Sequence, residues 1–142
     1  MKRLVIIGIL TAGTAFAHSG VKNADVLARM EGMKQIGSAM KTLGMMVKGQ
    51  TGFDASLANE ALNAITAEAQ KIPELFETPA TDPKSEALPV IWDEFEDFTA
   101  KARDLEKLAG KLAGSIESKS ELETAMQQIG QSCKSCHSDY RQ

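Results

Sequence analysis

Apolar residues recur in alternating steps of four and three along four stretches of the chain, and no stretch alternates with a period of two. This spacing places side chains on one face of an α-helix, so the pattern predicts four amphipathic helices and no strands. The first helix is expected over residues 23–47 and the second over residues 54–77. The apolar stripe of the first comprises Val26, Met30, Met33, Gly37, Met40, Gly44 and Val47. The stripe of the second comprises Ala58, Leu62, Ile65, Ala69, Ile72 and Phe76.

The third and fourth helices follow the same rule. The third is expected to begin at Pro89, because proline suits the first turn of a helix. Its stripe comprises Ile91, Phe95, Phe98, Ala102, Leu105, Ala109, Leu112 and Ile116. The fourth is expected to begin at a capping box that pairs Ser118 with Glu121, or Ser120 with Glu123. Its stripe comprises Leu122, Ala125 or Met126, Ile129, Cys133, Cys136 and Tyr140.

Short polar segments separate the helices. Asn23 or Asp25 can cap the first helix, and Asp54 can cap the second. Pro73 should kink the second helix or end it one turn early, and residues 78–88 form a proline-containing loop. Helices of roughly 20–25 residues with short connections pack most simply as an antiparallel up-down-up-down four-helix bundle. The predicted fold class is therefore all-α, in one domain.

The sequence Cys133-Lys134-Ser135-Cys136-His137 carries the chemistry of the chain. It matches the attachment signal of a c-type haem. On a helix the positions i, i+3 and i+4 share a face, so both thiols and the imidazole point toward one porphyrin. We expect one haem c per chain, bound covalently through Cys133 and Cys136 and enclosed by the bundle, with His137 as the proximal iron ligand.

Other uses of the two cysteines fit less well. A thioredoxin-like redox pair belongs in a βαβ context, which the predicted helices do not provide. A structural zinc site needs four nitrogen or sulfur ligands, and the only other histidine of the chain is His18. A plain disulfide is sterically possible but leaves the neighbouring His137 unexplained.

Residues 1–17 have the pattern of a secretory signal. Lys2 and Arg3 precede a short apolar run, and small residues end the segment at Ala17. A membrane-spanning helix would need about 20 apolar residues, more than this run offers. Cleavage after about Ala17 leaves a domain of residues 18–142 in the periplasm, where c-type haem is attached. Losing Lys2 and Arg3 changes the net charge from −3 to −5, and no basic patch suggests nucleic acid or an anionic membrane.

Antiparallel packing predicts which residues lie on the other side of the iron. The end of the last helix lies level with the start of the first, so the group opposite His137 should come from residues 26–33. Met33, and after it Met30, lie in this window, whereas Met40 lies about 10 Å beyond Met33 along the axis. A thioether is a soft ligand but also a good core filler, so Met33 either ligates the iron or packs over it. Core filling is expected for the remaining helical methionines, Met40, Met45, Met46 and Met126.

These features resemble the class II c-type cytochromes, which comprise cytochrome c′ and the low-spin cytochromes c-556. The resemblance covers essentially the whole mature chain. It rests on the motif at the end of the last helix, followed four residues after its histidine by Arg141. It also rests on the pattern Arg29-x-x-x-Met33 in the first helix and on Ile91-Trp92 at the start of the third.

The resemblance assigns expected roles to individual residues. It implies that Arg29 lies beside a haem propionate and that Arg141 lies near the solvent side of His137. Met33 falls where cytochrome c′ carries a non-bonding distal side chain and where c-556 carries its methionine ligand. Met30 occupies a position where cytochrome c′ commonly has Gln or Lys, which brings this chain closer to c-556.

Two functions follow, and neither is enzymatic. In the first, His137 and Met33 hold a low-spin iron, and the acidic surface guides transient docking to basic periplasmic redox partners. In the second, Met33 only packs over a five-coordinate iron, and the resemblance to cytochrome c′ implies NO or CO binding. A peroxidase is disfavoured, because only Arg29 or Glu31 could act as a distal acid–base group. The chain is compatible with a monomer or a homodimer.

Overall fold

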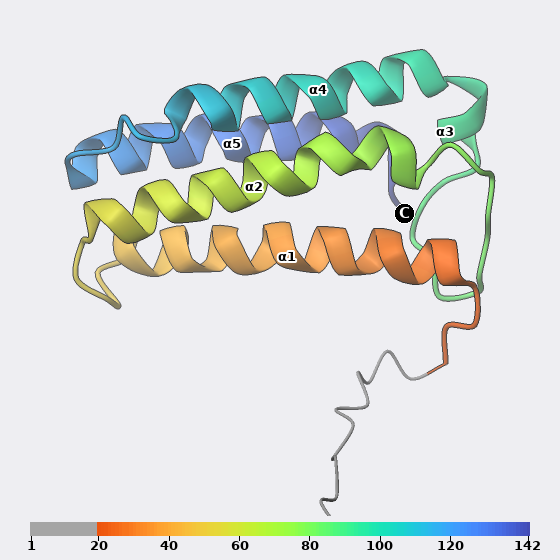
Figure 1. The fold of residues 1–142 in the computed structure, drawn as a ribbon, viewed down its shortest axis with the longest axis horizontal. Helices are drawn as coiled ribbons and strands as arrows, with labels where there is room; N and C mark the ends of the chain where they lie inside the picture. Colours follow the sequence, from red (N-terminus) through yellow and green to blue (C-terminus); the bar gives the residue numbers. More distant parts are fainter. Residues whose placement is uncertain (1–19) are drawn as a thin grey trace, which may run out of the picture.

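The computed structural model describes residues 20–142, and in this range the chain forms helices and no β-strands. Four long helices run alternately up and down, with a single helical turn before the third of them (Figure 1). The long helices are α1 (Ala24–Val47), α2 (Ala55–Leu75), α4 (Phe95–Leu112) and α5 (Lys119–Tyr140), and the single turn is α3 (Val90–Asp93). Neighbours in the bundle are α1 and α2, α2 and α4, α4 and α5, and α5 and α1. The predicted antiparallel four-helix bundle is confirmed, whereas the predicted signal segment lies outside the described residues.

Side chains at the helix starts fix three of the boundaries. The Asn23 side chain accepts hydrogen bonds from two backbone N–H groups of the first turn of α1, so Asn23 is the cap rather than Asp25. Asp54 caps α2 by accepting from the backbone N–H of the third helical residue. Ser118 and Glu121 form the reciprocal capping box of α5. These contacts satisfy N–H groups that have no partner inside the helix.

All four long helices contribute to the core, and α2 and α5 do so through their predicted stripes. All six stripe residues of α2 are buried. In α5 the buried residues are Leu122, Ala125, Ile129 and Tyr140, and the two cysteines pack against them while half-exposed. None of the helices among residues 20–142 has the length and apolar character that crossing a membrane requires.

The predicted stripe of α1 is wrong in its register. Of its seven residues only Val26 is buried, and the core face instead comprises Val26, Arg29, Ile36, Ala39, Leu43 and Met46. Met33 is 36% exposed. Core filling is confirmed for Met46. The methionine- and glycine-rich stripe therefore lies beside the core-facing side of α1.

The third predicted helix is also corrected, because it is broken at Glu94. The backbone of Glu94 has φ −119° and ψ 36°, which separates α3 from α4. At the far end α4 stops at Leu112, and Ile116 is buried from a connecting segment rather than from a helix. α2 continues through Pro73 and ends at Leu75, just before the predicted end.

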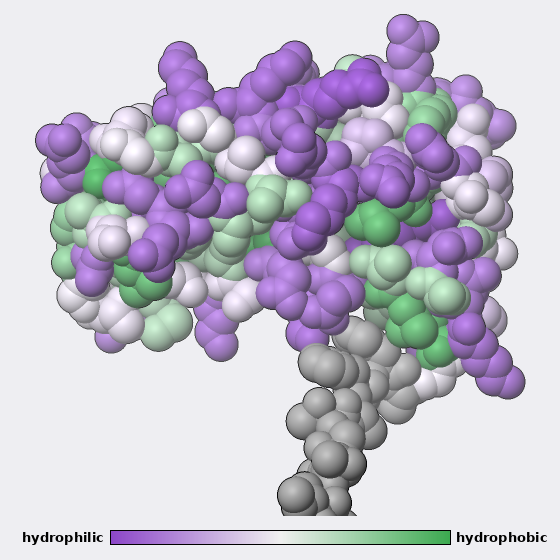
Figure 2. Space-filling model, in the orientation of Figure 1, coloured by the Kyte–Doolittle hydropathy of each residue, from purple (hydrophilic) through white to green (hydrophobic). Residues whose placement is uncertain are grey.

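The segments that surround the candidate site lie together at one end of the bundle. The start of α1, the end of α2, α3 and the C-terminus lie together at this end (Figure 1). Figure 2 shows apolar side chains at the surface over the first half of α1, and further apolar surface at the opposite end of the bundle.

Candidate functional site

The last turns of α5 present both cysteines toward the interior of the bundle. Cys133 and Cys136 are half-buried, pack against the core and are not joined in a disulfide. Burial raises the pKa of Cys133 and raises that of Cys136 to about 11. Reactive redox cysteines have lowered pKa values. The surroundings of the two cysteines are therefore not those of a thioredoxin-like redox pair.

His137 follows the cysteines at the exposed edge of α5. Partial desolvation and the positive charge of Arg141 lower the pKa of its imidazole, while Glu86 acts in the opposite direction. The neutral imidazole is the form that ligates metals. The predicted proximal ligand thus has the protonation state that iron ligation requires.

The chain that follows His137 is tied to the end of the 78–88 loop. Leu88 N donates to Tyr140 O at 2.9 Å, and Gln142 N donates to Glu86 O at 2.9 Å. Arg141 Nε donates to Glu86 Oε2 at 2.6 Å. This loop therefore pairs with the C-terminal residues and restrains the backbone just beyond the motif.

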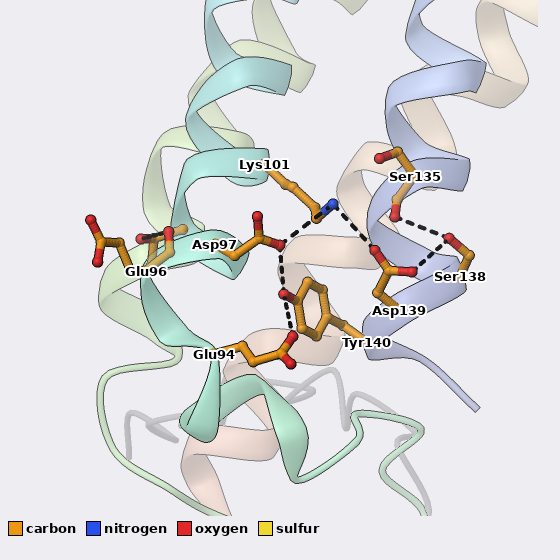
Figure 3. Close-up of polar contacts among 9 residues, drawn as sticks. Glu94, Glu96, Asp97, Lys101, Ser135, Ser138, Asp139 and Tyr140 are labelled. Carbon is orange, nitrogen blue, oxygen red and sulfur yellow. Dashed lines mark hydrogen bonds and ion pairs between the residues drawn. The ribbon is translucent and has the colours of Figure 1, made fainter.

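Tyr140, the last residue of α5, anchors this turn to α4. Its hydroxyl donates to Asp97 Oδ2 at 2.7 Å and lies 3.1 Å from Glu94 Oε2 (Figure 3). The ring is buried and meets Phe98 edge to face, with centroids 5.3 Å apart. The residue that ends the motif-bearing helix is thus fixed both by packing and by a hydrogen bond.

Lys101 joins the same two helices farther along the bundle. Its Nζ lies 3.5 Å from Asp97 Oδ2 and 3.2 Å from Asp139 Oδ2 (Figure 3). The hydrogen bond from Tyr140 is the largest cause that lowers the pKa of Asp97, and Lys101 lowers it further. Exposed ion pairs contribute little to stability, so the buried Tyr140 carries most of this attachment.

Tyr140→Phe should raise the pKa of Asp97 toward its usual value, because the variant keeps the ring and loses the hydrogen bond. A carboxyl whose pKa is lowered by folding contributes stability above its unfolded pKa, and this contribution is lost as the pH falls through the folded value. The stability deficit of the variant should therefore shrink below about pH 4. Carbon-13 NMR titration of Asp97 and unfolding at neutral and acidic pH measure both effects. An unchanged Asp97 pKa would contradict the bond.

A contact between α1 and α5 indicates which residues of the two helices lie at the same height along the bundle axis. A β-carbon added at Gly44 of α1 would lie 3.9 Å from Met126 Cε of α5. Met33 precedes Gly44 by eleven residues, and His137 follows Met126 by eleven residues. Because the helices are antiparallel, both steps lead about 16 Å toward the same end of the bundle. Eleven residues are close to three full turns, so Met33 and His137 stay on the faces that carry the Gly44–Met126 contact.

The helix faces between these two levels are open. Gly37 lies opposite Cys133 in this register, and a β-carbon added at Gly37 would meet no atom within 4 Å. The same holds for Gly130 on α5. Two thiols, a neutral imidazole and a thioether are the donor set that a covalently bound haem needs, and the glycines at 37 and 130 place no side chain between them. Met30 would lie level with Tyr140, one turn beyond His137, and fits the distal position less well.

Arg29 is buried, and its guanidinium is bonded to backbone carbonyl oxygens. Nε donates to Leu75 O at 2.7 Å, Nη1 donates to Ala80 O at 2.9 Å, and Nη2 donates to Thr78 O. A guanidinium has five N–H groups, so these bonds leave two for other acceptors. The expected contact of Arg29 with a haem propionate stays a prediction. The expected position of Arg141 near the solvent side of His137 also stays a prediction in its relation to the haem.

Sequence comparison assigns the chain to a family. The family model described as Cytochrome C′ matches residues 24–141. The chain is 33% identical to cytochrome c-556 of Agrobacterium fabrum over 138 residues, which cover 96% of this chain and 90% of that protein. It is 34% identical to cytochrome c′ of Rhodopseudomonas palustris over 141 residues, which cover 96% and 92%.

The chain belongs to the cytochrome c′ family. The solved structure of cytochrome c′ from Rhodopseudomonas palustris matches its fold with a TM-score of 0.78 at 31% identity, over 85% of this chain and 98% of that one. Like its family, the chain carries covalently attached haem c, and Cys133 and Cys136 are the cysteines of the attachment motif. Cytochrome c′ proteins transfer electrons or bind ligands and are not enzymes. Relatives named c-556 and c′ match about equally well, so the names do not choose between these two functions.

Asp97 and Glu86, which bond to Tyr140 and Arg141 at this end of the bundle, were not singled out from the sequence. Tyr140 was predicted to face the core, but its bond to Asp97 joins positions 43 residues apart. The Glu86–Arg141 pair spans 55 positions. Neither pairing has a signal in the local sequence, because the two partners lie on different segments of the chain.

Proposed function

We propose that this cytochrome c′ family protein is a periplasmic electron carrier whose iron is held by His137 and Met33. The observation that carries the proposal is the register of α1 and α5. The contact of Gly44 with Met126 supports it, because counting eleven residues along each helix from that contact leads to Met33 on α1 and to His137 on α5. Met33 is also the large apolar side chain of α1 that stands exposed at this end.

Each residue of the site has a separate task. Cys133 and Cys136 attach the haem, which supplies a one-electron ferrous–ferric couple. His137 would hold the iron through its neutral imidazole and Met33 through its thioether. Methionine ligation favours the ferrous state and raises the reduction potential. No side chain needs to give or take a proton in this function.

The surface near the site suits a positively charged partner. The start of α4 carries a shallow hollow lined by acidic side chains, and Tyr140 of α5 reaches two of them. The lining residues are Asp93, Glu94, Phe95, Glu96, Asp97 and Ala100. Complementary charge accelerates encounter, and redox encounters are small and transient. The partner would therefore be a basic redox protein of the periplasm, to which residues 1–17 would direct the chain.

Carbon monoxide distinguishes electron transfer from gas binding. In the ferrous wild-type protein Met33 should occupy the sixth position, so addition of CO should leave the absorption spectrum unchanged over minutes. Met33→Ala is the matched control and should bind CO readily. Rapid CO binding by the wild type would contradict the electron-carrier proposal.

The second candidate is a five-coordinate protein that binds NO or CO. It is favoured by the exposure of Met33 and by the open space at Gly37 beside the same face of α1. In this case Met33 would line the distal side without bonding to iron. Rapid CO binding that is equal in wild type and Met33→Ala would support this alternative.

A further inference from the structure

Arg29 joins α1 to the end of α2 through a buried charge. Its side chain is buried to 4% exposure, although it lies in the second turn of α1. Three of its N–H groups donate to the carbonyls of Leu75, Thr78 and Ala80. These carbonyls belong to the last residue of α2 and to the loop that follows. One side chain therefore ties the start of α1 to a segment about 50 positions away in the sequence.

Two aromatic rings complete the clamp. The guanidinium carbon of Arg29 lies 4.6 Å from the centroid of the Phe76 ring and 5.3 Å from that of Trp92. Trp92 Nε1 donates to Phe76 O at 2.9 Å. Cation–π contacts with a desolvated guanidinium add to the hydrogen bonds. We call Arg29, Phe76 and Trp92 the arginine clamp.

The clamp acts close to the proposed iron ligand. Met33 follows Arg29 by four positions, so the two are neighbours on one face of α1 and lie about 6 Å apart along the axis. Gly32, between them, faces α2, because a β-carbon there would lie 3.5 Å from Leu75 Cδ1. The first turns of α1 cannot slide along α2 without breaking the bonds of Arg29 or this close contact.

We infer that Arg29 is a positioning residue for Met33, which holds the start of α1 at the height where the thioether meets the iron. The inference rests on the proposed ligation of iron by Met33. A thioether is a weak ligand that dissociates from iron part of the time. The apparent affinity for an added ligand such as imidazole rises with the fraction of protein in which the thioether has dissociated. Loosening the clamp therefore changes how often Met33 leaves the iron, even though Arg29 itself does not touch the ligand.

The test is an imidazole titration of the ferric holoprotein, followed by its absorption spectrum and electron paramagnetic resonance. Arg29→Lys keeps the charge but cannot present the guanidinium fork to three carbonyls. We expect the apparent affinity for imidazole to rise about tenfold, equivalent to about 1.4 kcal/mol. A high-spin fraction should appear in the absence of imidazole.

Asn59→Ala is the matched control, because Asn59 makes a comparable clamp at the opposite end of the bundle. Its Oδ1 accepts from Gly114 N at 2.8 Å and from Ile116 N at 3.2 Å, and its Nδ2 donates to Ile116 O at 3.0 Å. This variant should lower the midpoint of unfolding without changing the imidazole affinity. A general loss of stability is thereby separated from displacement of Met33.

Trp92→Phe is a second variant for the case that Arg29→Lys does not fold. It removes the bond to Phe76 O while keeping an aromatic ring beside the guanidinium, and it should shift the imidazole affinity in the same direction by a smaller factor. It also leaves Arg29 available to a propionate, so its effect reports on the clamp alone.

The outcomes separate this inference from the proposed function. A high-spin wild type would overturn both. Suppose instead that the wild type is low-spin and that Met33→Ala makes it high-spin, as the proposed function requires. An unchanged imidazole affinity in Arg29→Lys would then overturn the role of Arg29 alone. If Arg29→Lys is unfolded, the same result in Trp92→Phe would do so.

Discussion

Met33→Ala should convert the ferric protein from low spin to high spin and lower its reduction potential by on the order of 0.1 V, within the range of about 0.8 V that axial ligands cover. The thioether is lost from the iron, and with it the preference for the ferrous state. Met33 is exposed rather than part of the core, so its truncation should leave the bundle folded. Electron paramagnetic resonance and spectroelectrochemistry measure the two effects.

Met30→Ala is the control for the register of α1. Met30 lies nearly one turn before Met33 and, in the pairing of α1 with α5, beyond the level of His137. The variant should keep the low-spin spectrum and the potential of the wild type. If Met30→Ala became high-spin and Met33→Ala did not, the alignment drawn from Gly44 and Met126 would be wrong.

Replacing both Cys133 and Cys136 by serine should abolish covalent attachment of the haem. Mass spectrometry of the denatured variant should find the mass of the polypeptide alone, whereas the wild type should carry the added mass of one haem. A group that binds the native state only also stabilises it, so the variant should unfold at a lower temperature. Each effect follows from the same two thiols on the inner face of α5.

Ser135→Ala tests whether these losses are specific to the thiols. Ser135 lies between the two cysteines and is exposed, so the substitution changes the motif without removing an attachment point. It should retain one covalent haem. Covalent haem in the double cysteine variant would contradict the attachment through Cys133 and Cys136.

The sequence predicted α2 and α5 well because their buried residues are apolar and interrupted by polar ones on the other faces. In α1 this contrast fails for two reasons. Methionine and glycine form a second stripe that looks apolar, and the buried Arg29 looks like a surface residue. Arg29 can be buried only because three carbonyls from distant positions accept its hydrogen bonds. The local periodicity of the sequence cannot reveal these partners, because they lie about 50 positions away.

The break at Glu94 has a similar origin. The apolar period continues from Ile91 through Phe98, because both sides of the break still turn inward. Tertiary contacts hold the interruption: Trp92 donates to the carbonyl of Phe76, and the Tyr140 hydroxyl lies beside Glu94. A stripe records which residues face the core, and it does not require that the backbone between them be continuously helical.

The motif at residues 133–137 was the most predictable part of the site, since its chemistry depends on residues that are close in sequence. The distal side depends on how α1 is placed against α5, and the contact between Gly44 and Met126 reports this placement. Antiparallel topology limited the distal group to residues 26–33. The level of Met33 became definite only when a contact between the two helices was known.

Ligation of the iron by Met33 is tested most directly by the red edge of the ferric absorption spectrum. Methionine bound to ferric haem produces a weak long-wavelength charge-transfer band. We expect this band in the purified wild-type protein at neutral pH and expect it to disappear in Met33→Ala. A wild-type spectrum that lacks the band and shows a high-spin iron would contradict the ligand pair of His137 and Met33.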